Sequence, residues 1–301
     1  MTRRVLITGG GGFVGSHLAQ GFKALGDAVF AADRLFDTAT RQRLAGVDLI
    51  EGELLSGEIA LPHADIVIHG AAITTPAEGN AASEDLLLSA NIALTNRVFR
   101  HAIDSGAKDF VFISSSGVFS ATDGDGVHLE STAPTADLPY AKAKRAGEDA
   151  ATAATELRAI SIRLGPIYGP DERPRDTRTI VSPIRRWLNM ALSGEPIIVD
   201  MPAERRDWTF APDLALALDA LLHKQQPLRG VFHLTSSQSI ANIDLARMIA
   251  DLVPGARIVI GDTMRIERLP MASDRLDLSA LYEWTTLPTG LARILSAEAR
   301  A

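Results

Sequence analysis

Residues 5–15 read VLITGGGGFVG, and this stretch decides the fold class of the chain. Val5–Thr8 is an apolar run typical of a buried strand, and Phe13–Leu25 has the apolar spacing of a helix. Glycines at positions 9, 12 and 15 join the two with the spacing G-x-x-G-x-x-G. Such a turn lets the backbone approach a pyrophosphate, and the helix N-terminus offers it free N–H groups. Glycines alone would also fit a flexible turn, but this position between strand and helix favours a dinucleotide site.

The same alternation of short apolar runs and longer helical patterns continues to residue 164. Continuous apolar strands that alternate with helices indicate a parallel sheet covered on both faces, with right-handed crossovers. The expected fold class is therefore α/β, a doubly wound parallel sheet of the Rossmann type. The further strands expected are Ala28–Asp33, Asp65–Gly70, Phe110–Ser114 and Ala159–Leu164, and the further helices are Leu86–Ile103 and Ala141–Leu157.

The regular alternation of strand and helix patterns ends after Leu164. Residues 165–183 hold four prolines and the dense charge run Asp171–Arg178, which together indicate a loop. Shorter elements follow, namely a strand near Pro196–Val199 and helices near Ile184–Leu192, Asp213–His223 and Ile243–Leu252. We expect a dinucleotide-binding domain at 1–165 and a smaller C-terminal α/β substrate lobe at 166–301, with some exchange of chain between them.

Composition excludes several classes of function. The 301 residues carry 30 Lys and Arg against 37 Asp and Glu, a net charge of −7 that disfavours a nucleic-acid binder. The absence of cysteine excludes disulfides, thiolate zinc sites and a cysteine nucleophile, and we expect no metal site. The longest apolar stretch, near Leu214–Leu222, is interrupted by Asp219 and is too short to span a membrane. We therefore expect a cytoplasmic protein that acts on a small molecule, without a membrane or nucleic-acid partner.

Asp33 ends the second expected strand, 24 residues after Gly9. A carboxylate at this place accepts hydrogen bonds from the adenosine ribose hydroxyls and repels a 2′-phosphate, so NAD is favoured over NADP. Arg34 follows directly and would partly offset that repulsion. The alternative is an ordinary surface aspartate at the end of a strand.

One of only three tyrosines is placed for acid–base chemistry. Tyr140 and Lys144 lie four positions apart on an expected helix, and therefore on one face. A tyrosine with a pKa near 10 is a poor base at neutral pH, but a nearby ammonium stabilises its phenolate. Ser114–Ser116 ends a strand at the sheet edge where ligands bind, so a serine there could hydrogen-bond a substrate hydroxyl. Both features have alternative explanations: a Tyr–Lys pair at this spacing is common on helix surfaces, and serines at the end of a strand often cap a helix or a loop.

These features, in this order, resemble the extended short-chain dehydrogenase/reductase family, the NAD-dependent epimerase/dehydratase group. The resemblance spans nearly the whole chain, and the catalytic residues it implies are Ser115, Tyr140 and Lys144. The matching segments are Thr8–Gly15 (TGxxGxxG), His69–Ala72 (HxAA), Asn91–Asn96, Ser115–Phe119 (S/TxxVY), Pro139–Glu148 (PYxxxKxxxE), Arg163–Pro170, Arg206–Asp213 and Leu281–Leu291. The implied cofactor contacts are Gly9, Gly12, Phe13, Val14, Gly15, Asp33, Arg34, Glu53, Leu54, Gly70, Ala71, Ala72, Asn91, Tyr140, Lys144, Gly165 and Ile167.

The chain departs from the family pattern at several positions. Glu53 replaces the usual aspartate, Lys142 replaces a serine, and Phe119 replaces the tyrosine of V-Y-G. Pro166 replaces the asparagine that many nucleotide-sugar enzymes carry, which puts a nucleotide-linked substrate in doubt. Ser116 and Gly117 occupy the two positions where 4,6-dehydratases carry Asp-Glu, and this difference argues against dehydration.

The substrate lobe is rich in arginine. Residues 171–186 hold five arginines against three acids, and arginine forks suit carboxylates and phosphates. We expect an anionic substrate, a sugar acid or a nucleotide sugar, with contacts from Thr74, Ser115, Ser116, Arg178 and Arg206. Surface ion pairing with the neighbouring acids is the alternative for these arginines.

The expected activity is NAD-dependent oxidation of a secondary alcohol of a sugar or sugar derivative, either as a dehydrogenase or as an epimerase. A nucleotide-sugar 4-epimerase is one narrower alternative. A non-catalytic NAD(P)-binding regulatory or scaffold protein is the other. The resemblance also implies a homodimer through the helices around Leu86–Ile103 and Ala141–Leu157, although core packing would explain their apolar faces equally well.

Overall fold

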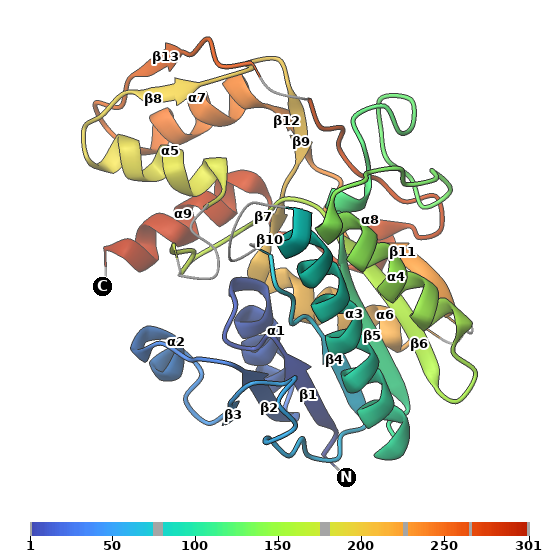
Figure 1. Ribbon diagram of the computed structural model, residues 1–301. Coiled ribbons are helices and arrows are strands. Elements are labelled where there is room, and N and C mark those ends of the chain that lie inside the picture. The colour runs from blue at the N-terminus through green and yellow to red at the C-terminus, as the bar shows by residue number, and fades with distance from the viewer. Residues whose placement is uncertain (1, 75–80, 175–180, 225–227, 265–266, 300–301) are drawn as a thin grey trace.

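The computed structural model describes residues 2–74, 81–174, 181–224, 228–264 and 267–299 (Figure 1). Within these ranges one sheet holds seven parallel strands in the order β11-β6-β5-β4-β1-β2-β3. The order changes direction between β1 and β4, and ligands bind at the carboxyl edge of such a switch point. The doubly wound parallel sheet predicted from the sequence is confirmed. Its strands are β1 (Arg4–Thr8), β2 (Ala28–Asp33), β3 (Asp48–Glu51), β4 (Ile66–His69), β5 (Asp109–Ser115), β6 (Arg158–Leu164) and β11 (Gly230–His233).

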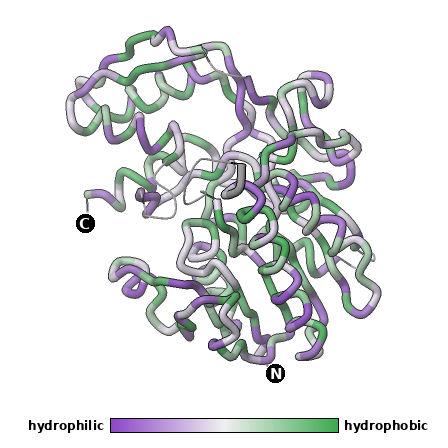
Figure 2. Tube along the Cα trace, viewed as in Figure 1, coloured by the Kyte–Doolittle hydropathy of each residue, from purple (hydrophilic) through white to green (hydrophobic). Residues whose placement is uncertain are grey.

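Helices cover both faces of this sheet. On one face α1 (Phe13–Ala24) packs on α6 (Leu214–Leu222), and on the other α3 (Ala81–Asp104) packs on α4 (Pro139–Ala153). Side chains of β1 alternate between the two cores, because successive residues of a strand face opposite ways: Val5 and Ile7 join the α1 side, and Leu6 joins the α3 side. Figure 2 shows the hydrophobic residues concentrated along these strands.

Some element bounds differ from the sequence prediction. Helix α3 begins at Ala81, five residues before the expected start, and α2 (Thr38–Arg43) and β3 were not predicted. Helix α4 begins at Pro139, because proline fits the first turn of a helix, and it ends at Ala153, four residues short of the expected end. Asp37 caps α2 by accepting a hydrogen bond from the Thr40 N–H at 2.7 Å.

The C-terminal part builds a second, smaller core, seen at the top of Figure 1. Trp187, Leu245 and Leu291 bring three of its helices together, and each of the three side chains is at most 1% exposed. The elements of this lobe are α5 (Pro183–Leu192), β8 (Ile197–Val199), α7 (Asn242–Leu252), β13 (Ile258–Ile260) and α9 (Leu287–Glu298).

Short elements connect this lobe to the large sheet. Two-stranded pairs join β7 (Ile167–Tyr168) to β10 (Thr209–Phe210) and β9 (Arg205–Asp207) to β12 (Ser239–Ala241), and α8 (Leu278–Leu281) contacts α6. Two later segments return to the large sheet, since β11 pairs with β6 and α6 packs on α1. The domain division at residue 165 stays a prediction. None of the helices within the described ranges has the length and hydrophobicity that crossing a bilayer requires.

Candidate active site

A cleft of about 690 Å³ lies at the carboxyl ends of β1, β4, β5 and β6. It is the switch-point edge of the sheet, and part of the small lobe forms its opposite wall. The predicted site residues that line it are Gly9, Gly12, Phe13, Val14, Gly15, Gly70, Ala72, Thr74, Ser115, Ser116, Tyr140, Lys144, Gly165, Ile167 and Arg206. Tertiary structure therefore brings residues from both parts of the chain to one cavity.

The glycine loop is shaped as the sequence predicts. Gly9 has a φ of +75°, and a Cβ there would lie 2.6 Å from the Ala71 nitrogen. A Cβ on Gly15 would lie 2.1 Å from the Gly9 carbonyl oxygen, so α1 can pack this close to β1 only with glycine. Gly12 caps α1 without a side-chain hydrogen bond. The first turn of α1 therefore keeps its N–H groups for a ligand, and this cradle fits the pyrophosphate of a dinucleotide.

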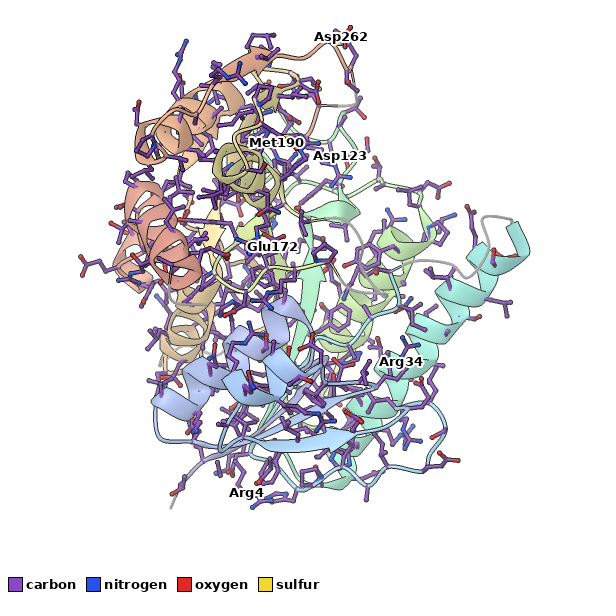
Figure 3. All side chains as sticks on the ribbon, turned by 90° about the vertical axis from the view of Figure 1, so that its left-hand side faces the viewer. Arg4, Arg34, Asp123, Glu172, Met190 and Asp262 are labelled. Carbon is purple, nitrogen blue, oxygen red and sulfur yellow. The ribbon has the colours of Figure 1, made fainter. Side chains whose placement is uncertain are left out.

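Asp33 supports the glycine loop from the end of β2. Its Oδ2 accepts a hydrogen bond from the Gly11 N–H at 2.9 Å, and its Oδ1 accepts one from the Arg34 N–H at 2.7 Å. The Arg34 side chain is exposed, and it is labelled in Figure 3. Neither residue lines the cleft itself, so their contact with an adenosine ribose stays a prediction.

Four other expected cofactor residues lie outside the cleft lining. Leu54 is buried in the core beneath α3, whereas Glu53 is exposed. Ala71 borders Gly9 through its backbone. The Asn91 carboxamide holds the chain after β4 in place: its Oδ1 accepts from the Ile73 N–H at 2.9 Å, and its Nδ2 donates to the Ile73 carbonyl at 3.0 Å. The expected substrate residue Arg178 lies outside the described residues.

The predicted catalytic residues meet where β5 ends and α4 begins. Ser115 is the last residue of β5, Tyr140 lies in the first turn of α4, and Lys144 follows one turn later. Ser115 and Tyr140 flank Gly117, since a Cβ there would lie 3.2 Å from Ser115 Oγ and 3.7 Å from Tyr140 Cε1. Ser115 Oγ accepts a hydrogen bond from the Gly117 N–H at 3.0 Å.

Lys144 is a buried cation beneath the tyrosine. Its Nζ donates to the Ile113 carbonyl at 2.7 Å and lies 5.6 Å from the centre of the Tyr140 ring. Burial lowers the pKa of Lys144 to about 8, and the negative charge of Glu148 opposes that shift. An ammonium at this place favours the tyrosinate form of its neighbour.

The lobe adds residues to the cleft that sequence reasoning did not assign to it. Glu172 and Arg173 belong to the predicted charge run, and Arg268 follows β13 with no motif to mark it. Glu172 is buried, and its carboxylate accepts from the Ser182 N–H at 2.7 Å and from the Ser182 hydroxyl at 2.6 Å. In Figure 3 it lies near the middle of the molecule.

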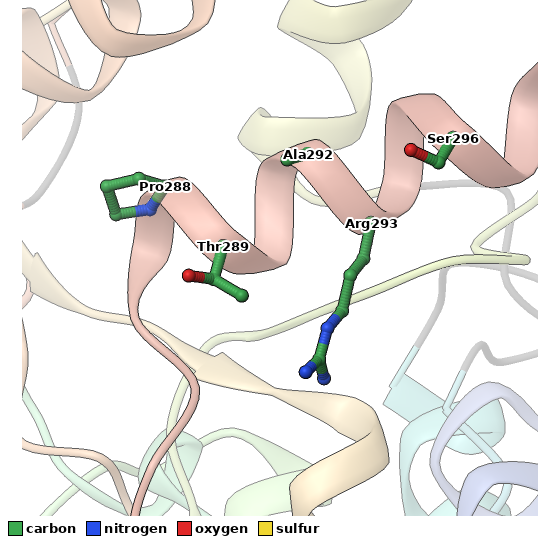
Figure 4. A pocket seen from close by; sticks show the side chains of 5 residues that line it. All are labelled: Pro288, Thr289, Ala292, Arg293 and Ser296. Carbon is green, nitrogen blue, oxygen red and sulfur yellow. The ribbon is translucent and has the colours of Figure 1, made fainter.

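The arginines of the lobe do not all face the cleft. Arg185 is buried and pairs with Glu298 of α9 at 2.6 Å, an acid far away in the chain and not one of its sequence neighbours. Arg206 does line the cleft, and its Nη1 lies 3.5 Å from a Glu204 oxygen. A separate hollow on α9 is lined by Pro288, Thr289, Ala292, Arg293 and Ser296 (Figure 4), none of which is a predicted site residue.

A family model described as the NAD dependent epimerase/dehydratase family matches residues 5–233. The chain belongs to this family. It is an NAD-dependent enzyme of the extended short-chain dehydrogenase/reductase type, and the resemblance, enzyme class and cofactor expected from the sequence are confirmed. The alternative of a non-catalytic scaffold is set aside.

Three relatives have low sequence identity to this chain but align with most of its length. The low-salt glycan biosynthesis protein Agl12 of Haloferax volcanii is 24% identical over 267 residues, which cover 84% of this chain and 83% of that protein. The solved structure of MoeE5 in complex with UDP-glucuronic acid and NAD is 25% identical, with a TM-score of 0.78 and 99% of both chains covered. UDP-glucuronic acid 4-epimerase from Bacillus cereus, at 21% identity, has a TM-score of 0.82 over 99% of both chains.

Proposed function

We propose that this enzyme oxidises a secondary alcohol of an anionic sugar derivative, with Ser115, Tyr140 and Lys144 as its catalytic residues. One observation carries the proposal: a single cleft joins the glycine loop of α1 to these three side chains and to the arginines of the lobe. Acid–base, cofactor and anion-binding groups thus border the same space. The reaction class is an epimerisation or a dehydrogenation.

Tyr140 is the proton acceptor in this proposal. Its phenolate takes the proton of the substrate hydroxyl while the carbon that carries it is oxidised, and Ser115 Oγ orients that hydroxyl. Lys144, held at the Ile113 carbonyl, stabilises the phenolate by its charge. When bound, NAD supplies the two-electron redox chemistry. The glycine loop would hold its pyrophosphate, and Asp33 its adenosine ribose.

The lobe supports an anionic substrate. Arg173, Arg206 and Arg268 reach the cleft from three separate segments, and arginine binds carboxylates and phosphates through its fork of donors. The MoeE5 and Bacillus cereus structures hold UDP-glucuronic acid, which carries both kinds of anion. We therefore propose a nucleotide-linked sugar acid as the substrate. Pro166, which replaces the asparagine of many nucleotide-sugar enzymes, is the one position that argues against a nucleotide-linked substrate. Ser116 and Gly117, which replace the Asp-Glu of 4,6-dehydratases, favour epimerisation or dehydrogenation over dehydration.

Replacing Tyr140 with Phe tests the catalytic assignment. We expect Tyr140→Phe to lower kcat about 10²- to 10⁴-fold, because the variant keeps the ring and loses the group that moves the proton. The measurement is turnover with NAD on a panel of aldonates, uronates, free aldoses and UDP-sugars, followed by reduced-nicotinamide absorbance and by product analysis for epimers. Tyr282→Phe, which removes a hydroxyl outside the cleft, is the matched control. Near-normal turnover in Tyr140→Phe would refute the assignment.

We also propose a homodimer formed through α3 and α4. Leu86 on α3 and Leu138 at the start of α4 support it, since they are 68% and 67% exposed in the single chain. Sedimentation velocity on the purified protein distinguishes a dimer from a monomer.

A further inference from the structure

We propose that Glu148 is a positioning residue for the reaction, which keeps Lys144 charged and aligned with the end of β5. Glu148 itself lies away from the cleft lining and contacts neither substrate nor cofactor in the proposed function. The inference rests on the roles proposed above for Tyr140 and Lys144.

One face of α4 carries all three side chains. Tyr140, Lys144 and Glu148 follow one another at intervals of four residues, so they form a line from the cleft into the interior. The helix lies close to β5 beside this line of side chains: a Cβ on Gly147 would be only 2.2 Å from the Phe112 ring. Glycine at this position therefore lets the Lys144 ammonium reach the Ile113 carbonyl.

Glu148 is locked in a single arrangement. Its two oxygens accept hydrogen bonds from the Arg163 guanidinium at 2.8 and 2.7 Å, a bidentate pair in which both residues are 4% exposed. The Ser114 hydroxyl donates to the same carboxylate at 2.5 Å. A buried carboxylate with three such bonds is fixed in position.

These contacts fix the end of β5 relative to α4 through two adjacent strand residues. Lys144 holds the carbonyl of Ile113, and Glu148 holds the side chain of Ser114. Ser115 comes next in the chain. The two α4 side chains therefore set the distance between the proposed catalytic serine and the start of α4, where Tyr140 lies.

The charge of Glu148 also balances two buried cations, Lys144 and Arg163. It raises the pKa of Lys144 against the larger, opposing effect of burial. The other titratable groups that face this cluster are Tyr140 on α4, His69 on β4, His233 on β11 and His128, whose pKa is lowered by burial and by Arg163. Burial lowers the pKa of His69 to about 3 and that of His233 to about 4, so both are neutral near pH 7 and supply no compensating charge.

Replacing Glu148 with Gln tests this inference directly in the cofactor-free protein. The chain has five lysines, so ¹³Cε-lysine NMR, with Lys144→Met to assign the signal, follows the titration of Lys144 alone. We expect Glu148→Gln to lower the Lys144 pKa by about one unit, because an adjacent anion is lost. With NAD and substrate, the alkaline limb of the kcat profile should move to lower pH by the same amount, so that kcat at pH 8 falls about fivefold.

Two further variants keep the test decisive. Asp149→Asn removes the exposed neighbouring acid on α4 and should leave both titrations unchanged. Glu148→Gln combined with Arg163→Gln removes the charge imbalance and should recover folding stability while the Lys144 titration stays displaced. If the Lys144 titration is normal in a folded variant without Glu148, the inference is overturned. That result is separate from failure of the proposed function, which Tyr140→Phe decides.

Discussion

At the scale of single residues, the site depends on charged side chains that are buried. Lys144 is 5% exposed and Glu148 is 4% exposed, so neither is screened by water as a surface charge would be. The pKa of Lys144, about 8, means that the ammonium is present at pH 7 and is lost as pH rises through that value. Catalysis by a lysine-supported phenolate should accordingly weaken above pH 8.

Asp33 allows a prediction about cofactor choice. We expect Asp33→Asn to raise the NADP-to-NAD ratio of kcat/KM about tenfold or more, because the carboxylate no longer repels a 2′-phosphate. The amide oxygen can still accept from the Gly11 N–H, so the glycine loop keeps its support. Steady-state kinetics with both cofactors measure the ratio. Asp37→Asn, which removes a nearby charge and preserves a helix cap, should leave it unchanged, and an unaltered ratio in Asp33→Asn would exclude this role.

At the scale of elements, the contact between α4 and β5 determines the geometry of the proposed catalytic residues. Tyr140 and Lys144 belong to the helix, and Ser115 belongs to the strand. Their relative position therefore depends on how closely the helix packs on the sheet. Gly147 against Phe112 is the point where that spacing is set.

Gly147→Ala should disturb stability and activity together. The new methyl group would lie 2.2 Å from the Phe112 ring, so α4 must shift or the ring must move. We expect a loss of about 1–3 kcal/mol in the free energy of unfolding, measured with urea, and a lower kcat. Adding Phe112→Leu should restore part of both by making room. A Gly147→Ala variant with full activity would show that the spacing is not critical.

At the scale of the whole molecule, buried histidines make stability depend on pH, and three of the four have strongly lowered pKa values. Burial lowers the pKa of His17 to about 4, of His69 to about 3 and of His233 to about 4. The unfolded chain protonates such imidazoles near pH 6.5, so their contribution to stability is present above that pH and is lost as pH falls. Burial raises the pKa of Asp207 to about 6, so between about pH 4 and pH 6 the folded chain binds one proton there that the unfolded chain does not. This group therefore opposes the effect of the histidines.

These four groups predict acid sensitivity. Three histidines against one aspartate leave about two extra protons on the unfolded chain, so their joint contribution to the free energy of unfolding should fall by about 3 kcal/mol for each unit that the pH is lowered near pH 5. Urea unfolding at several pH values measures this slope. His17→Gln should reduce the slope, whereas His63→Gln, at an exposed position, should not. A slope that His17→Gln leaves unaltered would contradict the assignment.

Local patterns determined much of this protein. The strand–glycine–helix start, the alternation of strands and helices, and the four-residue spacing of Tyr140 and Lys144 all lie within one or two adjacent elements. Hydrophobic periodicity and backbone sterics act over such short distances, and they can therefore be read from sequence. The structural contacts of Leu54 and Asn91 could not be predicted from the sequence: Leu54 lies in the core, and Asn91 hydrogen-bonds the backbone of Ile73. Their contact with a cofactor stays a prediction.

Only the tertiary structure decided how remote segments complete the cleft. Arg268 reaches the site from a segment without a motif, while Arg185 from the predicted arginine cluster pairs with Glu298 instead. The Arg163–Glu148–Ser114 network likewise joins two strands to a helix. Such contacts depend on how whole elements pack, because the partners are far apart in the chain and no local periodicity relates them. Local sequence thus specified the sheet, the glycine loop and the spacing of Tyr140 and Lys144, whereas the packing of whole elements specified which charged side chains line the cleft.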